Sequence, residues 1–263
     1  MRVKDKVILV TGGGNGIGAA LCRRFKHEGA RGIAVVDIDA DGAGRVAADI
    51  GGSAVVADVS KESDIVRAVQ ETEKLYGPID LFCSNAGVAF MDEPDWKATS
   101  CPNENWQKAW NINVMAHVYA ARAVLPEMIA RGEGYLLNTV SAAGLLNQIG
   151  SASYSTTKHA AIGFAESLAI THGDDGIKVS VICPQAVATQ MIGDVEDGGP
   201  QGVDGILTPE EVADSVIAGL AEETFLILPH ARVRLYMSRK ISDYDRWLDG
   251  MRRFRRSTMG AGH

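Results

Sequence analysis

Tyr154 and Lys158 lie four residues apart in the segment YSTTK, which is followed by a run of mainly small residues, HAAIGFAESLA. On an α-helix, residues i and i+4 share one face, so the phenol and the ammonium can reach the same point in space. A phenol can exchange a proton with a substrate, and a nearby positive charge favours its ionised form. The same spacing also occurs on ordinary solvated helix surfaces, so the pair needs support from the rest of the chain.

A glycine-rich turn is the second candidate for chemistry. It reads VTGGGNGIGAA, and it follows a short apolar run and opens a helical pattern. Glycines allow a sharp turn there and let a pyrophosphate approach N–H groups at a helix N-terminus, where the helix dipole favours anions. No Lys-Ser or Lys-Thr pair follows at the spacing of a P-loop. A tight turn without a ligand is the alternative, but the order of strand, glycines and helix predicts dinucleotide binding by Gly12, Asn15, Gly16, Ile17 and Gly18.

An acidic residue, Asp37, ends the next apolar run about 20 residues beyond the glycines. A carboxylate there can accept hydrogen bonds from a ribose diol and would repel a 2′-phosphate. Neither the glycine turn nor the following DIDADGAG contains Arg or Lys before Arg45. Other acids occur in this loop, so a simple turn residue is the alternative. We predict NAD as the cofactor, in preference to NADP, with Asp37 and Ile38 among the residues that bind it.

Short apolar runs alternate with longer helical patterns along the whole chain. The runs are KVILVTG, GIAVVDI, SAVVADV, IDLFCSNAG, GYLLNTVS, IKVSVICP and FLILP. They are apolar throughout, as expected for strands that helices cover on both faces. We therefore expect an α/β fold, a doubly wound parallel (Rossmann) sheet of about seven strands in a single domain spanning 1–263. The expected helices lie at about 16–28, 42–50, 62–76, 103–131, 153–173 and 208–222, the last with a capping box from Thr208 to Glu211.

Composition excludes several classes of protein. The chain has 263 residues, 46% hydrophobic and 22% charged, which is typical of globular proteins. Its net charge of −7 disfavours nucleic-acid binding, and no apolar run is long enough for a membrane span or a secretion signal. We expect a cytoplasmic protein without nucleic-acid or membrane partners. No metal site or disulfide framework is expected, because the four cysteines form no CxxC pair: Cys22, Cys83, Cys101 and Cys183.

Taken together, the motifs resemble those of the short-chain dehydrogenase/reductase family. They span most of the chain in the family's order: TGGGNGIG, Asp58, NAG at 85–87, Asn113, Ser141, and YxxxK at 154–158. The resemblance implies hydride transfer with a nicotinamide while Tyr154 exchanges a proton with the substrate oxygen. Lys158 would lower the phenol's pKa from about 10 and bind the nicotinamide ribose. Ser141 would hold the substrate oxygen, and Asn113 would support a water that leads protons to the lysine.

The resemblance also implies further cofactor contacts at three strand ends. These are Asp58 and Val59, then Asn85, Ala86 and Gly87, and then Pro184, Val187 and Thr189 in PQAVAT. Tyr154 and Lys158 would contact the cofactor as well. The chain departs from the family pattern at two positions, because Ala116 and Gln185 stand where glycine is usual. A glutamine at position 185 could also point into the substrate space.

Two segments are expected to border the substrate, AAGLLNQIGSAS and QMIGDVEDGGPQGVDGI. The first has no charge and the second has only acids, so neither offers Arg or Lys to bind a carboxylate, phosphate or coenzyme A tail. We therefore predict a neutral, largely apolar secondary alcohol or ketone. Gly198, Gly199, Gly202 and Gly205 suggest a mobile lid over about 190–207. The expected substrate contacts are Ser141, Leu145, Leu146, Ile149, Tyr154, Gln185, Met191 and Ile192, although the apolar ones are as consistent with core packing.

Two further regions remain open to more than one interpretation. Phe90, Met91 and Trp96 could add to the pocket rim or simply pack their own loop. The C-terminal extension, about 230–263, concentrates arginines among aromatic residues. A solvated helix that packs Tyr236, Trp247 and Phe254 is favoured over nucleic-acid or membrane binding.

The small residues after Lys158 permit close helix approach, so we expect a homodimer or homotetramer. The leading function is an NAD-dependent alcohol dehydrogenase or ketone reductase. One alternative is a regulator that binds a dinucleotide without catalysis. The other is a sugar-nucleotide epimerase that shares YxxxK, although its expected glycine spacing differs and its larger second domain has no room here.

Overall fold

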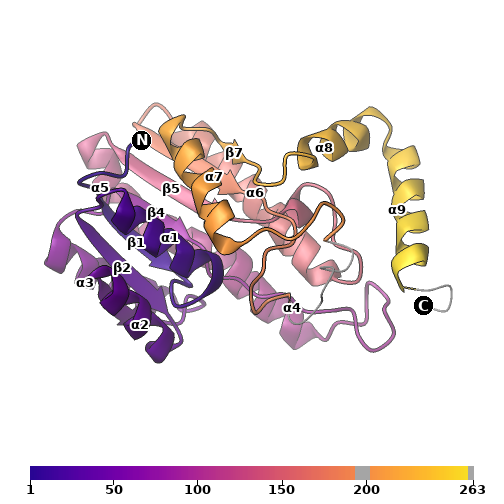
Figure 1. Cartoon of the computed structure of the whole chain (residues 1–263), viewed down its shortest axis with the longest axis horizontal. Coiled ribbons are helices and arrows are strands. Elements are labelled where there is room, and N and C mark those ends of the chain that lie inside the picture. The colour runs from indigo at the N-terminus through magenta and orange to yellow at the C-terminus, as the bar shows by residue number, and fades with distance from the viewer. Residues whose placement is uncertain (193–201, 260–263) are drawn as a thin grey trace.

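The computed structural model of the protein describes residues 1–192 and 202–259, and within them a seven-stranded sheet forms the centre (Figure 1). All neighbouring strands are parallel, in the order β3-β2-β1-β4-β5-β6-β7. The predicted doubly wound parallel sheet is therefore confirmed. The strands are β1 (Val7–Thr11), β2 (Gly32–Asp37), β3 (Ser53–Val56), β4 (Leu81–Ser84), β5 (Gly134–Thr139), β6 (Ile177–Ile182) and β7 (Leu226–Ile227).

Helices cover both faces of this sheet, as the uniformly apolar strands require. Two clusters of buried hydrophobic residues form the core, one on each face of the sheet, and each lies between the sheet and one layer of helices. Figure 1 shows two helices of one layer, α1 and α7, side by side. That layer contains α1 (Gly16–His27), α2 (Ala40–Ile50) and α7 (Pro209–Ala221), and the opposite layer contains α3 (Glu62–Tyr76), α5 (Ala116–Arg131) and α6 (Ala152–His172).

The strand order reverses between β1 and β4, which are neighbours in the sheet. Chain segments leave the carboxyl ends of these two strands in opposite directions. In open parallel sheets this reversal leaves a crevice in which ligands bind. The fold thus brings the glycine turn after β1 and the NAG segment after β4 together at one opening.

The long helix expected over 103–131 is interrupted. It consists of α4 (Asn103–Trp110), a π-helical turn (Asn111–Met115) and α5. Asn113 lies in this wider turn and is fully buried. A single π turn changes the hydrogen-bond spacing by one residue without changing the hydrophobic pattern much, so the sequence does not reveal it.

The start of α7 follows the predicted capping box. Thr208 Oγ1 accepts a hydrogen bond from the backbone N–H of Glu211, and the Glu211 side chain accepts from the backbone N–H of Thr208. This arrangement satisfies two N–H groups that the helix itself cannot pair.

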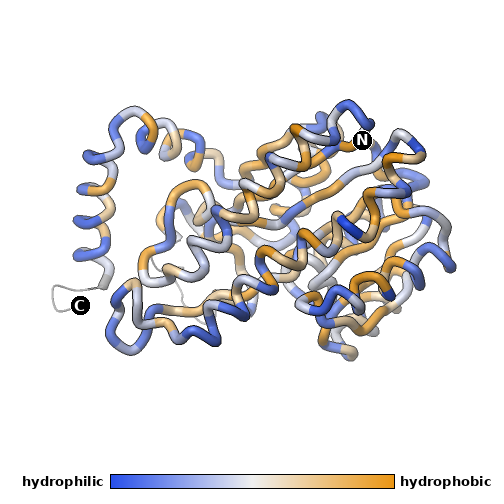
Figure 2. The backbone as a smooth tube through the Cα atoms, turned by 180° about the vertical axis from the view of Figure 1, so that it is seen from behind, coloured by the Kyte–Doolittle hydropathy of each residue, from blue (hydrophilic) through white to orange (hydrophobic). Residues whose placement is uncertain are grey.

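The C-terminal extension forms two helices, α8 (Val233–Ser242) and α9 (Tyr244–Met259), where one had been expected. Figure 1 shows α9 projecting beside the body of the molecule, and Figure 2 shows hydrophobic and hydrophilic residues alternating along it. Tyr236, Trp247 and Phe254 are half-buried. Across the described ranges, no helix is at once long and apolar enough to cross a bilayer.

Candidate active site

A cavity of about 460 Å³ opens at the carboxyl ends of the strands. Its lining comes from the ends of six strands and from α6, so residues far apart in the sequence meet there. Most of the residues predicted from the motifs lie on its walls: Gly12, Asn15, Gly16, Ile17, Asp37, Ile38, Asp58, Val59, Asn85, Ala86, Gly87, Ser141, Leu146, Tyr154, Lys158, Pro184, Gln185, Val187, Thr189, Met191 and Ile192.

Four predicted site residues do not belong to this lining. Gly18 is packed beneath the glycine turn, and Asn113 is buried behind the cavity wall. Leu145 packs against the hydrophobic core, and Ile149 is buried. The apolar pattern of the segment after Ser141 identifies a buried stretch, but it does not tell which side chains face the cavity and which face the core.

The glycine turn fits a pyrophosphate. Gly12 has φ +62°, and a Cβ atom there would lie 2.9 Å from the Ala86 Cα, so only glycine permits this approach. Gly18 allows α1 to start directly over the turn, because a Cβ there would lie 2.0 Å from the Gly12 carbonyl oxygen. The Asn15 side chain does not cap α1, and the first turn of that helix has no acid. Its N–H groups are therefore suited to bind an anion.

Asp37 is held at the edge of the same turn. Its Oδ2 accepts from the Gly14 N–H at 2.8 Å and its Oδ1 from the Asp39 N–H at 3.0 Å, and the residue is 7% exposed. A carboxylate has about four acceptor positions, so two remain for a ribose diol. The carboxylate is thus fixed by the backbone and still able to bind a sugar.

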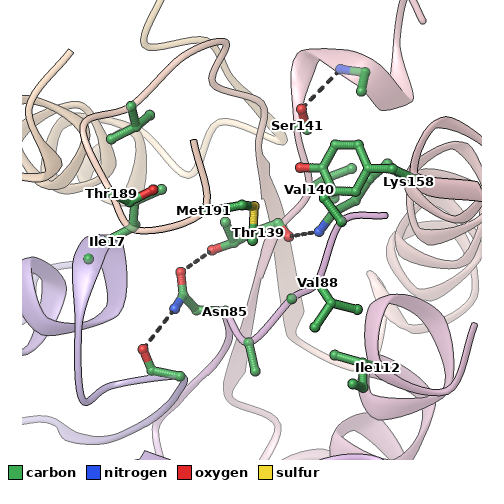
Figure 3. A pocket seen from close by; sticks show the side chains of 18 of the residues that line it. Ile17, Asn85, Val88, Ile112, Thr139, Val140, Ser141, Lys158, Thr189 and Met191 are labelled. Carbon is green, nitrogen blue, oxygen red and sulfur yellow. Dashed lines mark hydrogen bonds between the residues drawn. The ribbon is translucent and has the colours of Figure 1, made fainter. Parts of the chain in front are cut away.

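Asn85 ties three strand ends together (Figure 3). Its Nδ2 donates to the carbonyl oxygens of Thr11 and Gly12 at 3.1 and 3.2 Å, and its Oδ1 accepts from Thr139 Oγ1 at 3.0 Å. Sequence reasoning missed both threonines. Thr11 ends β1 in VTGGG, and Thr139 ends β5 in NTVS. Their positions at strand ends, directly before motif residues, could have identified them.

Tyr154 and Lys158 lie in the first two turns of α6 and face the same cavity, as their spacing predicts. Lys158 is 2% exposed, and its Nζ donates to the Thr139 carbonyl oxygen at 3.0 Å (Figure 3). Burial lowers the pKa of Lys158 from 10.5 to about 8. The ammonium is therefore anchored to the end of β5 in a region of low polarity.

The pKa of Tyr154 differs from the expectation. Burial raises it above its ordinary value of 10.0, and a hydrogen bond with the Ser141 side chain lowers it only in part. Lys158 is not among the groups that shift the pKa of Tyr154, so the predicted lowering by that ammonium is not found in this structure. The desolvation of the phenol is the larger effect.

Asn113 connects the NAG side of the cavity with α6. Its Oδ1 accepts from the Val88 N–H at 2.9 Å, and its Nδ2 donates to the Val88 carbonyl oxygen at 2.9 Å and to Thr157 Oγ1 at 3.1 Å. Both hydrogens of the amide group are thus already donated to protein atoms. If Asn113 binds the predicted water, it must therefore do so through an atom other than Nδ2.

Ser141 caps a short 3₁₀ turn (Ala142–Gly144) at the end of β5. Its Oγ accepts from the Ala143 N–H at 3.1 Å and lies 3.4 Å from the Pro184 carbonyl oxygen, to which it donates. The second of these hydrogen bonds is long, so the hydroxyl proton can turn toward a substrate oxygen in the cavity.

Gln185 lines the cavity, as predicted. Its backbone N–H donates to His230 Nδ1 at 3.1 Å, while its Oε1 is buried and has no hydrogen-bond partner among the described residues.

The predicted lid falls partly outside the described residues, since Gly198 and Gly199 are not among them. Met91 lines the cavity, whereas Phe90 and Trp96 do not.

The chain resembles known proteins over most of its length. A family model described as short chain dehydrogenase matches residues 6–199. The 1-deoxy-11-beta-hydroxypentalenate dehydrogenase of Streptomyces exfoliatus is 32% identical over 250 residues, which cover 92% of this chain and 90% of the relative. The meso-2,3-butanediol dehydrogenase of Serratia marcescens is 30% identical over 236 residues, with coverages of 85% and 90%.

Solved structures resemble it as well. The 3-ketoacyl-(acyl-carrier-protein) reductase of Brucella melitensis, complexed with NADH, is 29% identical, has a TM-score of 0.76, and is matched over 96% of its chain and 86% of this one. A short chain dehydrogenase/reductase from Burkholderia phymatum in complex with NAD has a TM-score of 0.83 at 22% identity, with coverages of 93% of this chain and 96% of that one, which indicates the shared fold.

Proposed function

The chain belongs to the short-chain dehydrogenase family of oxidoreductases, and on this basis we propose that it interconverts a neutral, largely apolar secondary alcohol and its ketone with NAD. One observation carries the proposal. Ser141, Tyr154 and Lys158 line the same cavity as the glycine turn and Asp37, so the proposed proton donor and the proposed dinucleotide site would share one space.

The proposed roles follow from this arrangement. A bound nicotinamide would supply the hydride acceptor or donor. Ser141 Oγ would orient the substrate oxygen, and the Tyr154 hydroxyl would exchange a proton with it. Lys158 would stabilise the negative charge that develops on the phenol, in a region where burial strengthens such interactions. The high pKa of the phenol favours its protonated form, which is the form needed to reduce a ketone.

Asp37 supports the choice of NAD. A 2′-phosphate beside this buried carboxylate would meet a like charge, whereas a ribose diol can donate to its two remaining acceptor positions. The 29% identical reductase of Brucella melitensis is itself described as a complex with NADH.

The polarity of the cavity supports a neutral substrate. Lys158 is the only Arg or Lys among the described lining residues, and it is already bonded to Thr139. The wall near the catalytic groups includes Val88, Ile112 and Leu146. Such a wall offers no partner for a carboxylate or phosphate. Two relatives are named as dehydrogenases of neutral alcohols, butanediol and borneol, whereas the hydroxypentalenate dehydrogenase is named for a substrate that carries a carboxylate.

The experiment is a screen of neutral secondary alcohols with NAD and NADP, in which the formation of reduced nicotinamide is followed by absorbance. We expect turnover with NAD and with apolar alcohols. A ketoacyl thioester, tested in the reverse direction, serves as the charged comparison. Faster turnover of the thioester than of every neutral ketone would contradict the proposal. Dinucleotide binding without any hydride transfer would favour the regulator instead.

We also propose a reducing, cytoplasmic location and a homo-oligomer. The four cysteines are free and buried, as expected in a reducing compartment.

The proposed homo-oligomer rests on the outward face of α6. This face carries Gly163, Ser167 and an Ile170 that is 84% exposed, a surface on which a second helix could pack closely. Light scattering at working concentration tests the second proposal, and a monomer would contradict it.

A further inference from the structure

Lys240 connects the C-terminal helices to the cavity wall. It lies in α8, is 8% exposed, and its Nζ donates to the carbonyl oxygens of Leu145 and Leu146 at 2.8 and 3.0 Å. Leu146 lines the cavity, and so do its neighbours Ala143 and Asn147. A residue near the end of the chain therefore holds the backbone of the segment that borders the substrate space.

Two aromatic rings complete the surroundings of this ammonium. Its Nζ lies 4.9 Å from the centroid of the Trp247 ring and 5.5 Å from that of Tyr244. The two rings meet edge to face, with centroids 5.7 Å apart. A desolvated ammonium over ring faces gains a cation–π contribution in addition to its hydrogen bonds. We call this arrangement of Lys240, Trp247, Tyr244 and the two carbonyl groups the Lys240 cage.

The far end of α9 contacts the other side of the opening. Arg255 donates to the Trp96 carbonyl oxygen at 3.2 Å. Trp96 belongs to the segment between β4 and α4, and Met91 of the same segment lines the cavity. In Figure 1, α9 accordingly runs from the end of α8 back toward this loop. The helix is thus attached at both ends to segments that border the cavity.

The later half of the substrate segment is held by other groups. The Gln148 N–H donates to Ser155 Oγ at 2.8 Å, and Ser151 Oγ donates to the Phe90 carbonyl oxygen at 2.6 Å. The earlier half passes Gly144, where a Cβ would lie 2.6 Å from the Lys158 carbonyl oxygen. Gly144 is therefore fixed by its packing against α6, and the Leu145 and Leu146 carbonyl oxygens that follow it are the part of the segment that Lys240 holds.

We propose that Lys240 is a positioning residue that fixes the 146–148 wall of the cavity and thereby sets the size of the alcohol that the enzyme accepts. This inference rests on the alcohol–ketone function proposed above. Its effect falls on the substrate and not on the dinucleotide, because the Lys240 cage holds the segment after Ser141 and makes no contact with the glycine turn or Asp37.

The first test is Lys240→Met, which keeps an unbranched apolar side chain but removes all three donors. We expect the KM for the best alcohol to rise about tenfold, which corresponds to the loss of a hydrogen bond from a charged donor. The kcat and the KM for NAD should stay within a factor of about two. The preference for small over bulky alcohols should weaken, and backbone amides of 145–150 should exchange hydrogen faster.

Three further variants separate positioning from simple destabilisation. Lys240→Arg retains donors and charge, so it should restore part of the lost substrate affinity. Arg239→Met alters an exposed neighbour in the same helix and should change nothing. If Lys240→Met does not fold, Trp247→Leu removes one of the two rings beside the ammonium. It should raise the KM for the alcohol in the same direction, but by a smaller factor.

Unchanged hydrogen exchange in 145–150 together with an unchanged alcohol KM would overturn the inference. So would a uniform fall in kcat accompanied by a higher KM for NAD, which would indicate general damage. If the native enzyme turned over no alcohol at all, the proposed function would fail, and the exchange of 145–150 in Lys240→Met against Arg239→Met would still decide the role of Lys240.

Discussion

The Nζ atom of Lys158 lies 5.5 Å from the centroid of the Tyr154 ring, and it donates its hydrogen bond to the Thr139 carbonyl oxygen at 3.0 Å. The ammonium is thus held beside the phenol by the end of a strand. In the proposed reaction it would stabilise negative charge on Tyr154 when the proton leaves. The i, i+4 spacing in the sequence thus corresponds to two neighbouring groups in space, as the proposed roles require.

The Tyr154→Phe variant tests the proton role. It removes one oxygen and keeps the ring, so the cavity and the dinucleotide site should persist. We expect kcat to fall by a factor of about 10²–10⁴, the usual contribution of a positioned general acid or base. NAD affinity, measured by fluorescence titration, should change little. Tyr76→Phe in α3, remote from the cavity, is the matched control. Equal turnover in both variants would exclude Tyr154 as the proton donor.

The Asp37→Ser variant tests the choice of cofactor. It removes the carboxylate that would bind the ribose diol and repel a 2′-phosphate, so kcat/KM for NAD should fall about tenfold or more. The ratio of NADP to NAD activity should rise. Asp41→Ser alters an exposed acid nearby, in the first turn of α2, and should leave both values unchanged. A native enzyme that already prefers NADP would contradict the role assigned to Asp37.

The fold could be predicted because its strands carry a strong signal. The residues of β1 and β2 are buried throughout, and a run that is apolar on both faces is typical of a strand between two helix layers. The alternation with helices then leaves the parallel doubly wound sheet as the simple arrangement. The run FLILP was expected as a full strand, but only Leu226 and Ile227 pair at the sheet edge, since the chain leaves there toward α8.

The remainder depends on contacts that sequence patterns do not contain. The acceptor for Lys158 is the backbone of Thr139, and backbone groups leave no signal in residue types. The π turn around Asn113 and the attachment of Lys240 to Leu145 and Leu146 are likewise products of tertiary packing. The pKa of Tyr154 was predicted with the wrong sign of shift, because spacing indicates which charge is near but not how much water is removed.

The Gly18→Ala variant tests the close packing of α1 on the glycine turn. The added Cβ would lie 2.0 Å from the Gly12 carbonyl oxygen and 2.6 Å from Asn85 Nδ2, so the turn must shift. We expect the free energy of unfolding to fall by about 1–3 kcal/mol and NAD binding to weaken. Gly44→Ala in α2 is the control, since its Cβ would meet nothing within 4 Å. That change should stabilise by about 0.5–1 kcal/mol, as measured by urea unfolding.

His117 predicts a specific acid sensitivity. The ring is buried in α5, and its Nδ1 hydrogen bonds to Asn138 Oδ1 at 2.8 Å. Burial, with a further contribution from nearby Lys158, lowers the pKa of His117 from 6.5 to about 4. Between these values the unfolded chain binds a proton that the folded protein does not, so the free energy of unfolding falls as the pH decreases. The loss of stability is absent well above pH 6.5 and reaches roughly 3 kcal/mol at pH 4.

The measurement is urea unfolding of the native protein and of His117→Gln at several pH values between about 7.5 and 4.5. Glutamine retains an N–H donor for Asn138 but does not titrate, so the variant should lose less stability than the native protein over this range. Carboxylates also titrate in acid, and for this reason the difference between the two proteins, not either slope alone, reports on His117. The exposed His27→Gln should follow the native curve. Parallel curves for the native protein and His117→Gln would mean that the buried imidazole accepts its proton as readily in the folded state as in the unfolded chain.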